Sequence, residues 1–183
     1  MSESIFQPST LSESIATARK AQQFVGFKLQ GQEYAFPIEQ IREIVIPSQL
    51  TSLPQVPDYI QGVCNLRGVI IPIVNLRRLF AMPASAIDTD SRTIVVNVGT
   101  RTMGCLVDSV TQVHRFTSDT IQPAPEIVQS GRTAYITGFA KVDGAPLILL
   151  NIEELLEPAK LDKVHASAVQ QFGQPHLLPA DRP

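Results

Sequence analysis

The feature that most constrains the fold of this chain is an internal repeat. Residues 59–80 align without a gap on residues 135–156, at a constant offset of 76. The matching positions include tyrosines, glycines and asparagines: Tyr59 and Tyr135, Gly62 and Gly138, Gly68 and Gly144, Asn75 and Asn151. Upstream, residues 25–44 align on 94–113 at an offset of 69, so the second copy has seven additional residues (76 − 69 = 7), which fall within 118–131. The chain is therefore predicted to be a duplication of one unit of about 60 residues, a size that is marginal on its own.

Both copies have the pattern of short strands separated by tight turns. Residues 24–30 alternate in polarity, and residues 69–74 form an apolar, β-branched run of strand length. Asn75 and Asn151 follow such runs where the N-cap of a short helix would lie. Three isoleucines recur at every third position and predict one short helical turn: Ile38, Ile41 and Ile44. Evenly spaced strands and turns indicate barrels or sandwiches, and two marginal units should pack against each other.

The repeat divides the chain into a globular part and two ends. The globular part is expected to span residues 23–158, with one lobe formed by residues of about 24–80 and the other by about 93–156. Residues 1–22 are polar and predict a flexible tail or a short helix. Residues 159–183 follow a proline and are predicted to form a second tail, with some helical pattern near its start.

Composition and charge narrow the class of protein. Hydrophobic residues make up 44% of the sequence and charged residues 17%, as in a globular protein. The net charge is −2 and no basic block is present, which argues against nucleic acid or an anionic membrane as the main partner. No apolar run approaches the roughly 20 residues of a membrane span, and the first residues do not have the pattern of a signal peptide. We therefore expect a cytoplasmic protein.

The sequence offers little that could perform catalysis. Its histidines, His114, His165 and His176, have no metal-ligand spacing, and neither a nucleophile elbow nor a glycine-rich phosphate loop is present. Cys64 and Cys105 are best interpreted as reduced core residues, with a disulfide as the less favoured alternative. We expect no enzyme activity, no cofactor and no metal, and instead a protein-binding module.

One residue departs from the rules of its local structure. Arg67 precedes Gly68 in a two-residue hairpin turn, where Asn-Gly or Asp-Gly is preferred, and the second copy has the ordinary pair Asp143-Gly144. The arginine could cap nearby carbonyls or cover apolar surface with its stem. Because the second copy builds the same turn without it, we favour a binding role, with the side chain projecting from the barrel beside the groove between the lobes.

These motifs together resemble the CheW-like family of bacterial chemotaxis coupling proteins, over nearly the whole globular part. The motifs are Gln32-Glu-Tyr-Ala, Ile41-Arg-Glu-Ile, Thr51-Ser-Leu-Pro, Asn65-Leu-Arg-Gly, Ile121-Gln-Pro-Ala-Pro-Glu and Leu149-Leu-Asn-Ile-Glu. The resemblance implies a mainly β fold of two five-stranded SH3-like barrels, side by side, with short helices. Asn75 departs from the aspartate common in the family, but both residues cap helices.

The resemblance also implies a function and a site. It implies an adaptor that joins the tip of a chemoreceptor to the regulatory domain of the histidine kinase CheA, in arrays where CheW-like domains form rings. It places the partner-binding residues in two motifs and in the proline-bearing loop: Arg67, Glu43, Ile41, Asn65, Gly62, Gln122, Glu126 and Ile127.

Two alternatives remain open at this point. One is a scaffold of the same fold that serves a non-flagellar chemosensory system, such as twitching or surface sensing. The other is a binder of small ligands that uses the groove between the barrels.

Overall fold

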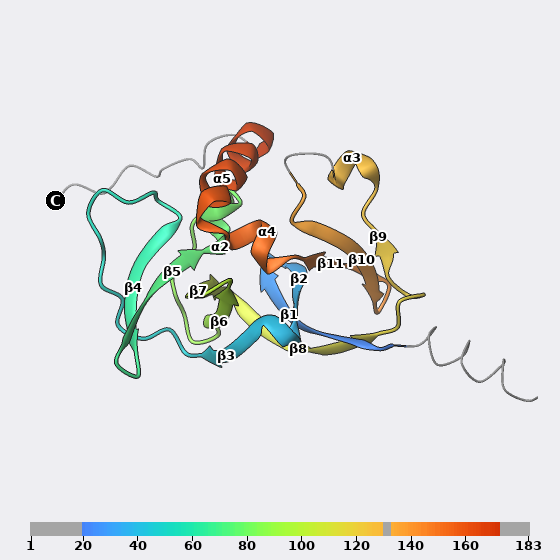
Figure 1. Cartoon of the computed structure of the whole chain (residues 1–183), viewed down its shortest axis with the longest axis horizontal. Coiled ribbons are helices and arrows are strands. Elements are labelled where there is room, and N and C mark those ends of the chain that lie inside the picture. Colours follow the sequence, from blue (N-terminus) through green and yellow to red (C-terminus); the bar gives the residue numbers. More distant parts are fainter. Residues whose placement is uncertain (1–19, 130–132, 173–183) are drawn as a thin grey trace, which may run out of the picture.

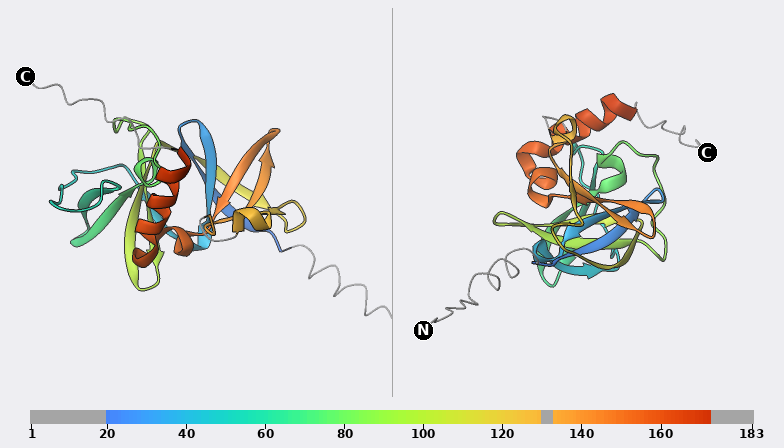
Figure 2. Two further views of the ribbon diagram at one scale, coloured as in Figure 1. Left: turned by 90° about the horizontal axis from the view of Figure 1, so that it is seen from above. Right: turned by 90° about the vertical axis from the view of Figure 1, so that its right-hand side faces the viewer.

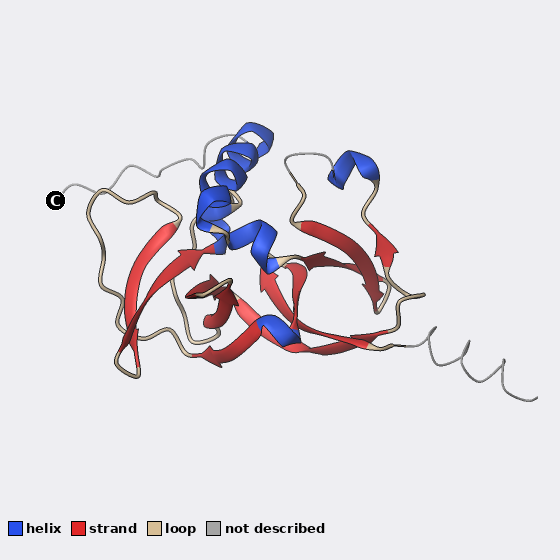
Figure 3. Ribbon diagram, viewed as in Figure 1, coloured by secondary structure: helices blue, strands red, loops and turns tan. Residues whose placement is uncertain are grey.

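The computed structural model describes residues 20–129 and 133–172, and it shows two β lobes joined by short helices (Figure 1 and Figure 3). Its strands are β1 (Gln22–Leu29), β2 (Gln32–Pro37), β3 (Ile41–Val45), β4 (Ile60–Leu66), β5 (Val69–Asn75), β6 (Arg92–Val98), β7 (Arg101–Val107), β8 (Ser109–Phe116), β9 (Gln122–Pro123), β10 (Ile136–Val142) and β11 (Ala145–Leu150). Its helices are η1 (Ile38–Gln40), α2 (Leu76–Leu79), α3 (Glu126–Gln129), α4 (Ile152–Leu156) and α5 (Pro158–Phe172).

The strands form two sheets with matching strand orders. Lobe 1 has the order β3-β6-β7-β5-β4, and lobe 2 has the order β8-β1-β2-β11-β10-β9. The short strand β9 gives lobe 2 its sixth member; in lobe 1 an isolated bridge between Thr51 and Val63 takes the same place. The predicted mainly β fold with two related lobes is confirmed.

Equivalent strands of the two copies have equivalent partners. β1 pairs with β2 and β8, and its counterpart β6 pairs with β7 and β3, all antiparallel. The parallel pair of lobe 2, β2 with β11, is matched by β7 with β5 in lobe 1. The expectation that residues 25–29 and 94–98 have the same role is therefore confirmed.

The expected composition of the lobes was wrong, because each lobe combines both copies. After Pro37 the turn η1 carries the chain into lobe 1, where β3 pairs with β6 of the second copy. After Val107 only Asp108 precedes β8, which returns to lobe 2 and pairs with β1. The hairpin β1–β2 of the first copy and the hairpin β6–β7 of the second copy have exchanged lobes. Because the copies are equivalent, this exchange preserves every type of strand pair, so the repeat alone cannot reveal it. The predicted helical turn is also confined to Ile38–Gln40, and β3 begins at Ile41.

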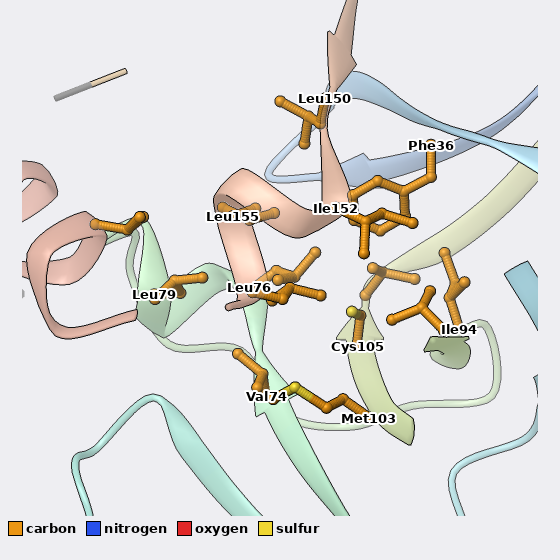
Figure 4. Packing of buried hydrophobic residues seen from close by; sticks show 14 of the residues in the cluster. Phe36, Val74, Leu76, Leu79, Ile94, Met103, Cys105, Leu150, Ile152 and Leu155 are labelled. Carbon is orange, nitrogen blue, oxygen red and sulfur yellow. The ribbon is translucent and has the colours of Figure 1, made fainter. Parts of the chain in front are cut away.

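The main hydrophobic core lies where the two lobes meet. It includes residues from both sheets and from the short helices: Phe27, Phe36, Val74, Leu76, Leu79, Ile94, Cys105, Leu150, Ile152 and Leu155 are among its fully buried members (Figure 4). Two smaller clusters fill the separate lobes: one around Ile71, Ile73 and Val95, the other around Ala35, Leu147 and Leu149. The largest apolar cluster therefore belongs to neither lobe alone, and the two lobes share one core.

Both predicted N-caps are present. The side-chain oxygen of Asn75 accepts a hydrogen bond from the amide of Arg78 at 3.2 Å. The Asn151 oxygen accepts from the amides of Glu153 and Glu154 at 2.9 and 3.2 Å. These bonds satisfy donors that the first turn of a helix leaves free, which explains how helices of four and five residues end two strands in the same way.

The helical pattern expected near the start of the C-terminal segment is confirmed by helix α5, but its interpretation as a tail outside the globular part was wrong. The helix lies over the junction between the lobes (Figure 2). Leu161 and Val164 are buried in the main core, and the Tyr59 hydroxyl donates to Asp162. The helix was underestimated because its apolar face becomes evident only when the surface on which it packs is known. Residues 1–19, which make up most of the predicted N-terminal tail, lie outside the described residues.

Candidate partner-binding site

The turn between β4 and β5 holds Arg67 in a left-handed backbone conformation. Arg67 and Gly68 have φ values of 53° and 86°, and Asp143 and Gly144 in the other hairpin have 50° and 80°. The side-chain oxygen of Asn65 accepts a hydrogen bond from the Gly68 amide at 2.8 Å, which stabilises the turn. Positive φ at both central residues is the geometry that favours Asn-Gly or Asp-Gly, so Arg67 occupies a position for which its type is poorly suited.

The structure brings Arg67 and Glu43 together across lobe 1. The Nη2 atom of Arg67 donates to Oε2 of Glu43 at 2.9 Å. The Arg67 side chain is 78% exposed, whereas that of Glu43 is only 18% exposed. A carboxylate without a partner would be costly to cover in this way, and the ion pair explains why Glu43 can be largely covered. An ion pair with such an exposed arginine contributes about 0–1 kcal/mol to stability, so folding alone gives little reason for the arginine.

Strand β3 presents Ile41 and Glu43 in different surroundings. Its pairing with β6 shifts register between Ile41 and Glu43, as in a β-bulge. Ile41 is half-buried and packs against the main core, whereas Glu43 reaches the β4–β5 turn. Ile41 therefore has a structural role at least in part, and Glu43 is the residue of this strand that holds Arg67.

Exposed aliphatic side chains flank the ion pair on both segments. Val69 and Ile70, directly after the turn, are 58% and 61% exposed, and Ile44 and Ile46, beside Glu43, are 40% and 72% exposed. Exposed apolar groups concentrated on two adjoining segments mark an interaction surface more often than scattered ones do. We call Glu43, Ile44, Ile46, Asn65, Arg67, Val69 and Ile70 the lobe 1 surface.

Sequence reasoning missed these aliphatic residues. The run of residues 69–74 is typical of a buried strand, and only its second half is largely buried. The signal that could have identified Val69 and Ile70 is their place next to the turn, where the strand extends beyond the sheet that covers it. Ile46 lies in a comparable place, because it directly follows the last residue of β3 and precedes Pro47.

Gly62 has a packing role. It is buried with φ of 144°, and a Cβ atom there would lie 2.4 Å from the carbonyl oxygen of Thr51. The close approach allows the two hydrogen bonds of the bridge that closes lobe 1, between the backbones of Thr51 and Val63 at 2.8 and 2.9 Å. We therefore leave Gly62 out of the contact surface.

The remaining predicted residues lie on lobe 2. Gln122 is exposed on β9, and Glu126 and Ile127 are exposed in helix α3, where Ile127 reaches 84% exposure. Figure 1 shows α3 and β9 at the opposite end of the molecule from the β4–β5 turn. The turn itself is at the outer end of lobe 1, so Arg67 does not lie beside the groove between the lobes as we had expected. The predicted site is therefore two separate surfaces.

The described residues include neither a metal-binding cluster nor an exposed thiol. No group of three or more His, Cys, Asp or Glu side chains that could hold a metal ion occurs among residues 20–129 and 133–172. Cys64 and Cys105 are free, and burial raises the pKa of both thiols, which disfavours the reactive thiolate. No helix in the described part of the chain has the length and apolar character needed to cross a membrane.

Known proteins share this sequence and this architecture. The family model described as CheW-like domain matches residues 23–160. The Chemotaxis protein CheW of Klebsiella aerogenes is 41% identical over 149 residues, which cover 80% of this chain and 90% of the relative. The Chemotaxis protein CheW of Helicobacter pylori is 36% identical over 135 residues, or 74% of this chain and 81% of the relative.

A more distant relative and a solved structure agree with these matches. Protein FrzA of Myxococcus xanthus is 28% identical over 147 residues, 79% of this chain and 91% of the relative. The crystal structure of the scaffolding protein TtCheW from Thermoanaerobacter tengcongensis superposes with a TM-score of 0.69 at 31% identity, covering 77% of this chain and 96% of that one. The family model covers most of this sequence, and the chain superposes on a solved relative over most of both chains, so the chain belongs to the CheW-like family.

Proposed function

We propose that this chain is a chemotaxis adaptor that couples chemoreceptors to the histidine kinase CheA. The observation that carries the proposal is the largely exposed Arg67, held by Glu43 at a turn that does not need it and flanked by exposed Val69 and Ile70. Arginine beside exposed aliphatic groups is the composition of a binding hot spot. The names of the relatives support the same conclusion, since they are chemotaxis and scaffolding proteins.

The two surfaces suggest two partners. We assign the lobe 1 surface to a receptor tip or to the regulatory domain of the kinase, because its arginine can form a bidentate pair with a carboxylate or bind backbone carbonyls. We assign Gln122, Glu126 and Ile127 to a contact with a further CheW-like domain in a ring. The protein would then work in the cytoplasm at receptor arrays, without nucleic acid and without inserting into the membrane.

Titration of the purified protein against each partner tests the proposal. The cognate kinase regulatory domain and a receptor-tip fragment are titrated with the wild type, with Arg67→Ala and with Arg67→Asp. We expect at least one affinity to fall about 30-fold, equivalent to ~2 kcal/mol, with the larger loss for Arg67→Asp because a carboxylate partner would then be repelled. Glu43→Lys should weaken the same interaction, since it removes the group that orients the arginine.

Arg101→Asp provides the matched control. Arg101 is exposed at the start of β7, and its replacement changes the charge equally at another turn. Its affinities should remain within twofold of the wild type. If both affinities of the two Arg67 variants also remain within twofold, Arg67 is a structural residue and the lobe 1 surface is assigned wrongly.

A second candidate function is a scaffold in a non-flagellar chemosensory system, such as one for twitching or surface sensing. It is kept because Protein FrzA, whose name does not refer to chemotaxis, matches over 79% of the chain. Deletion of the gene separates the two: loss of swimming chemotaxis supports the first function, and loss of surface movement with normal swimming supports the second.

A further inference from the structure

Exposed apolar side chains are concentrated in residues 44–70. Nine large hydrophobic side chains are exposed in the part of the chain that the structure describes, and six of them belong to this stretch. The six are Ile44, Ile46, Leu53, Val56, Val69 and Ile70, and the other three are Ile87, Val113 and Ile127. Such a concentration marks an interaction surface. The lobe 1 surface includes four of the six, so Leu53 and Val56, at 40% and 36% exposure, still need an explanation.

These two side chains belong to an exposed loop, residues 52–57, which is fixed to lobe 1 at its start. The backbones of Thr51 and Val63 exchange hydrogen bonds of 2.8 and 2.9 Å, and these bonds fasten the loop to β4. Leu50, just before the bridge, packs in the same small apolar cluster as Leu66. Figure 1 shows the segment between β3 and β4 at the same outer end of lobe 1 as the β4–β5 turn. The loop therefore continues the lobe 1 surface.

Helix α5 fixes the other end of the loop. The hydroxyl of Tyr59, a residue that is only 3% exposed, donates a hydrogen bond to Asp162. The Nε2 atom of His165 lies 3.2 Å from Oδ1 of Asp58, and the rings of His165 and Tyr59 are 5.2 Å apart. From helix α2, Nη1 of Arg78 donates to the carbonyl oxygen of Asp58 at 3.1 Å. We call the contacts of Asp58 and Tyr59 with Asp162 and His165 the α5 clasp.

The other half of the molecule has no equivalent of this clasp. Asp58 corresponds to Ala134, whose methyl group cannot form an ion pair. Arg78 corresponds to Glu154, whose carboxylate accepts from Lys160 at 2.8 Å instead. The repeated unit therefore folds without such a clasp. Because every residue of the loop 52–57 is exposed, packing alone does little to maintain its shape, and the clasp supplies that order.

Building on the function proposed above, we propose that the loop 52–57 is a further part of the partner-binding surface of lobe 1, kept in shape by the α5 clasp. Its partner is the protein that binds Arg67. The contacting face of that protein has a carboxylate for the arginine and, beside it, aliphatic groups for Leu53 and Val56. A loop that is ordered before binding loses less conformational freedom on binding, so the clasp raises the affinity.

Substitutions in the loop test the contact. Full-length Leu53→Ser and Val56→Ser are titrated against the kinase regulatory domain and the receptor-tip fragment. Each should weaken, by about fivefold, the same interaction that Arg67→Ala weakens. Ile87→Ser is the matched control, because Ile87 is similarly exposed, at 45%, and lies outside residues 44–70. Its affinities should remain within twofold of the wild type.

Backbone ¹⁵N relaxation tests the role of the clasp. Tyr59→Phe combined with His165→Ala removes both side-chain contacts, and Tyr135→Phe is the control at the equivalent position of the other half. The double variant should lower the order parameters of Leu53 and Val56 from about 0.85 to below about 0.6, while those of β4 remain at the rigid value. The control should leave all of them unchanged. A residue that only stabilises the fold would lower Tm without this local change.

Two results overturn the inference. The first is that the Leu53 and Val56 variants bind within twofold of the wild type while Arg67→Ala weakens binding, in which case the proposed function stands without the loop. The second is that the order parameters of the loop are unchanged in the double variant. Weaker binding by the loop variants with normal binding by Arg67→Ala contradicts the proposed function, and with it the partner named here, so the two failures are distinguishable.

Discussion

The hairpins β4–β5 and β10–β11 have the same backbone and carry different side chains. Their turns agree in φ to within a few degrees, at 53° and 86° against 50° and 80°. Yet Arg67, Val69 and Ile70 in the first hairpin correspond to Asp143, Ala145 and Pro146 in the second. The second hairpin shows that the fold needs neither the arginine nor the exposed aliphatic groups. The side chains at the tip of the β4–β5 hairpin are therefore available for a purpose other than folding. The comparison of the two hairpins also provides an internal control for each prediction below.

The largest effect should come from α5, which has no counterpart in the first copy. Ending the chain after Glu157 removes Leu161 and Val164 from the core, at about 1.5–3 kcal/mol each. We expect a loss of about 3–6 kcal/mol and a fall in Tm of roughly 6–24 °C, measured by thermal denaturation. Ala166→Ser, an exposed substitution on the same helix, should leave Tm unchanged. A Tm within 2 °C of the wild type after truncation would show that α5 does not stabilise the lobes.

The equivalence of the two halves can be tested within the core. Leu79→Ala and Leu155→Ala truncate corresponding residues that are both fully buried in the main core. Each should lower the free energy of unfolding by about 2–5 kcal/mol, and the two losses should agree to within about 1 kcal/mol. Urea titrations followed by circular dichroism give these values. A biphasic transition, with one lobe unfolding before the other, would contradict a core shared between the lobes.

A smaller and asymmetric effect is expected at the paired glycines. Gly62→Ala forces a Cβ atom to 2.4 Å from the Thr51 carbonyl oxygen at a φ of 144°, and Gly138→Ala forces one to 2.7 Å from the Gln122 carbonyl oxygen without a positive φ. We expect a loss of about 1–3 kcal/mol at Gly62 and a smaller loss at Gly138, because only the first adds backbone strain. Equal losses, measured by urea unfolding, would show that contact rather than φ dominates.

The smallest stability effect should come from exchanging the two turn residues. Arg67→Asp creates the turn residue of the other hairpin, and Asp143→Arg does the reverse. Both should change the free energy of unfolding by less than about 1 kcal/mol, because the Arg67–Glu43 pair is exposed on one side. Adding 0.5 M salt should reduce even that difference, through screening. A loss of several kcal/mol for Arg67→Asp would assign the arginine to folding and weaken the proposed function.

Features determined by local chemistry were predictable from the sequence. Positive φ at Arg67 followed from its place before Gly68, and the caps at Asn75 and Asn151 followed from the strand ends that precede them. The equivalence of β1 and β6 followed from the repeat. For the turn and the two caps, the residues that determine the conformation lie within a few positions of the residue that adopts it.

Features determined by contacts between distant segments were not predictable in this way. The exchange of the hairpins β1–β2 and β6–β7 between the two copies leaves the hydrophobic pattern of each strand unchanged. The sequence of a single strand therefore does not indicate which copy supplies its partner. The cover over Glu43 depends on Arg67, which is 24 residues away. Helix α5 depends on a surface that only the assembled lobes create, since Leu161 packs among residues from both copies.

The interleaved path of the chain has a consequence for synthesis on the ribosome. The hairpin β1–β2 is the first structure to emerge, yet its partners β8 and β11 are among the last strands to be made. Between Pro37 and Leu150 the ribosome adds residues at roughly 5–20 per second, so the second edge of this hairpin waits on the order of ten seconds for its partner. Lobe 1, by contrast, can close once β7 is complete at Val107. Lobe 2, whose first strands are synthesised earliest, is therefore the last to be completed. The nascent chain is most vulnerable to aggregation through the unpaired edges of these N-terminal strands.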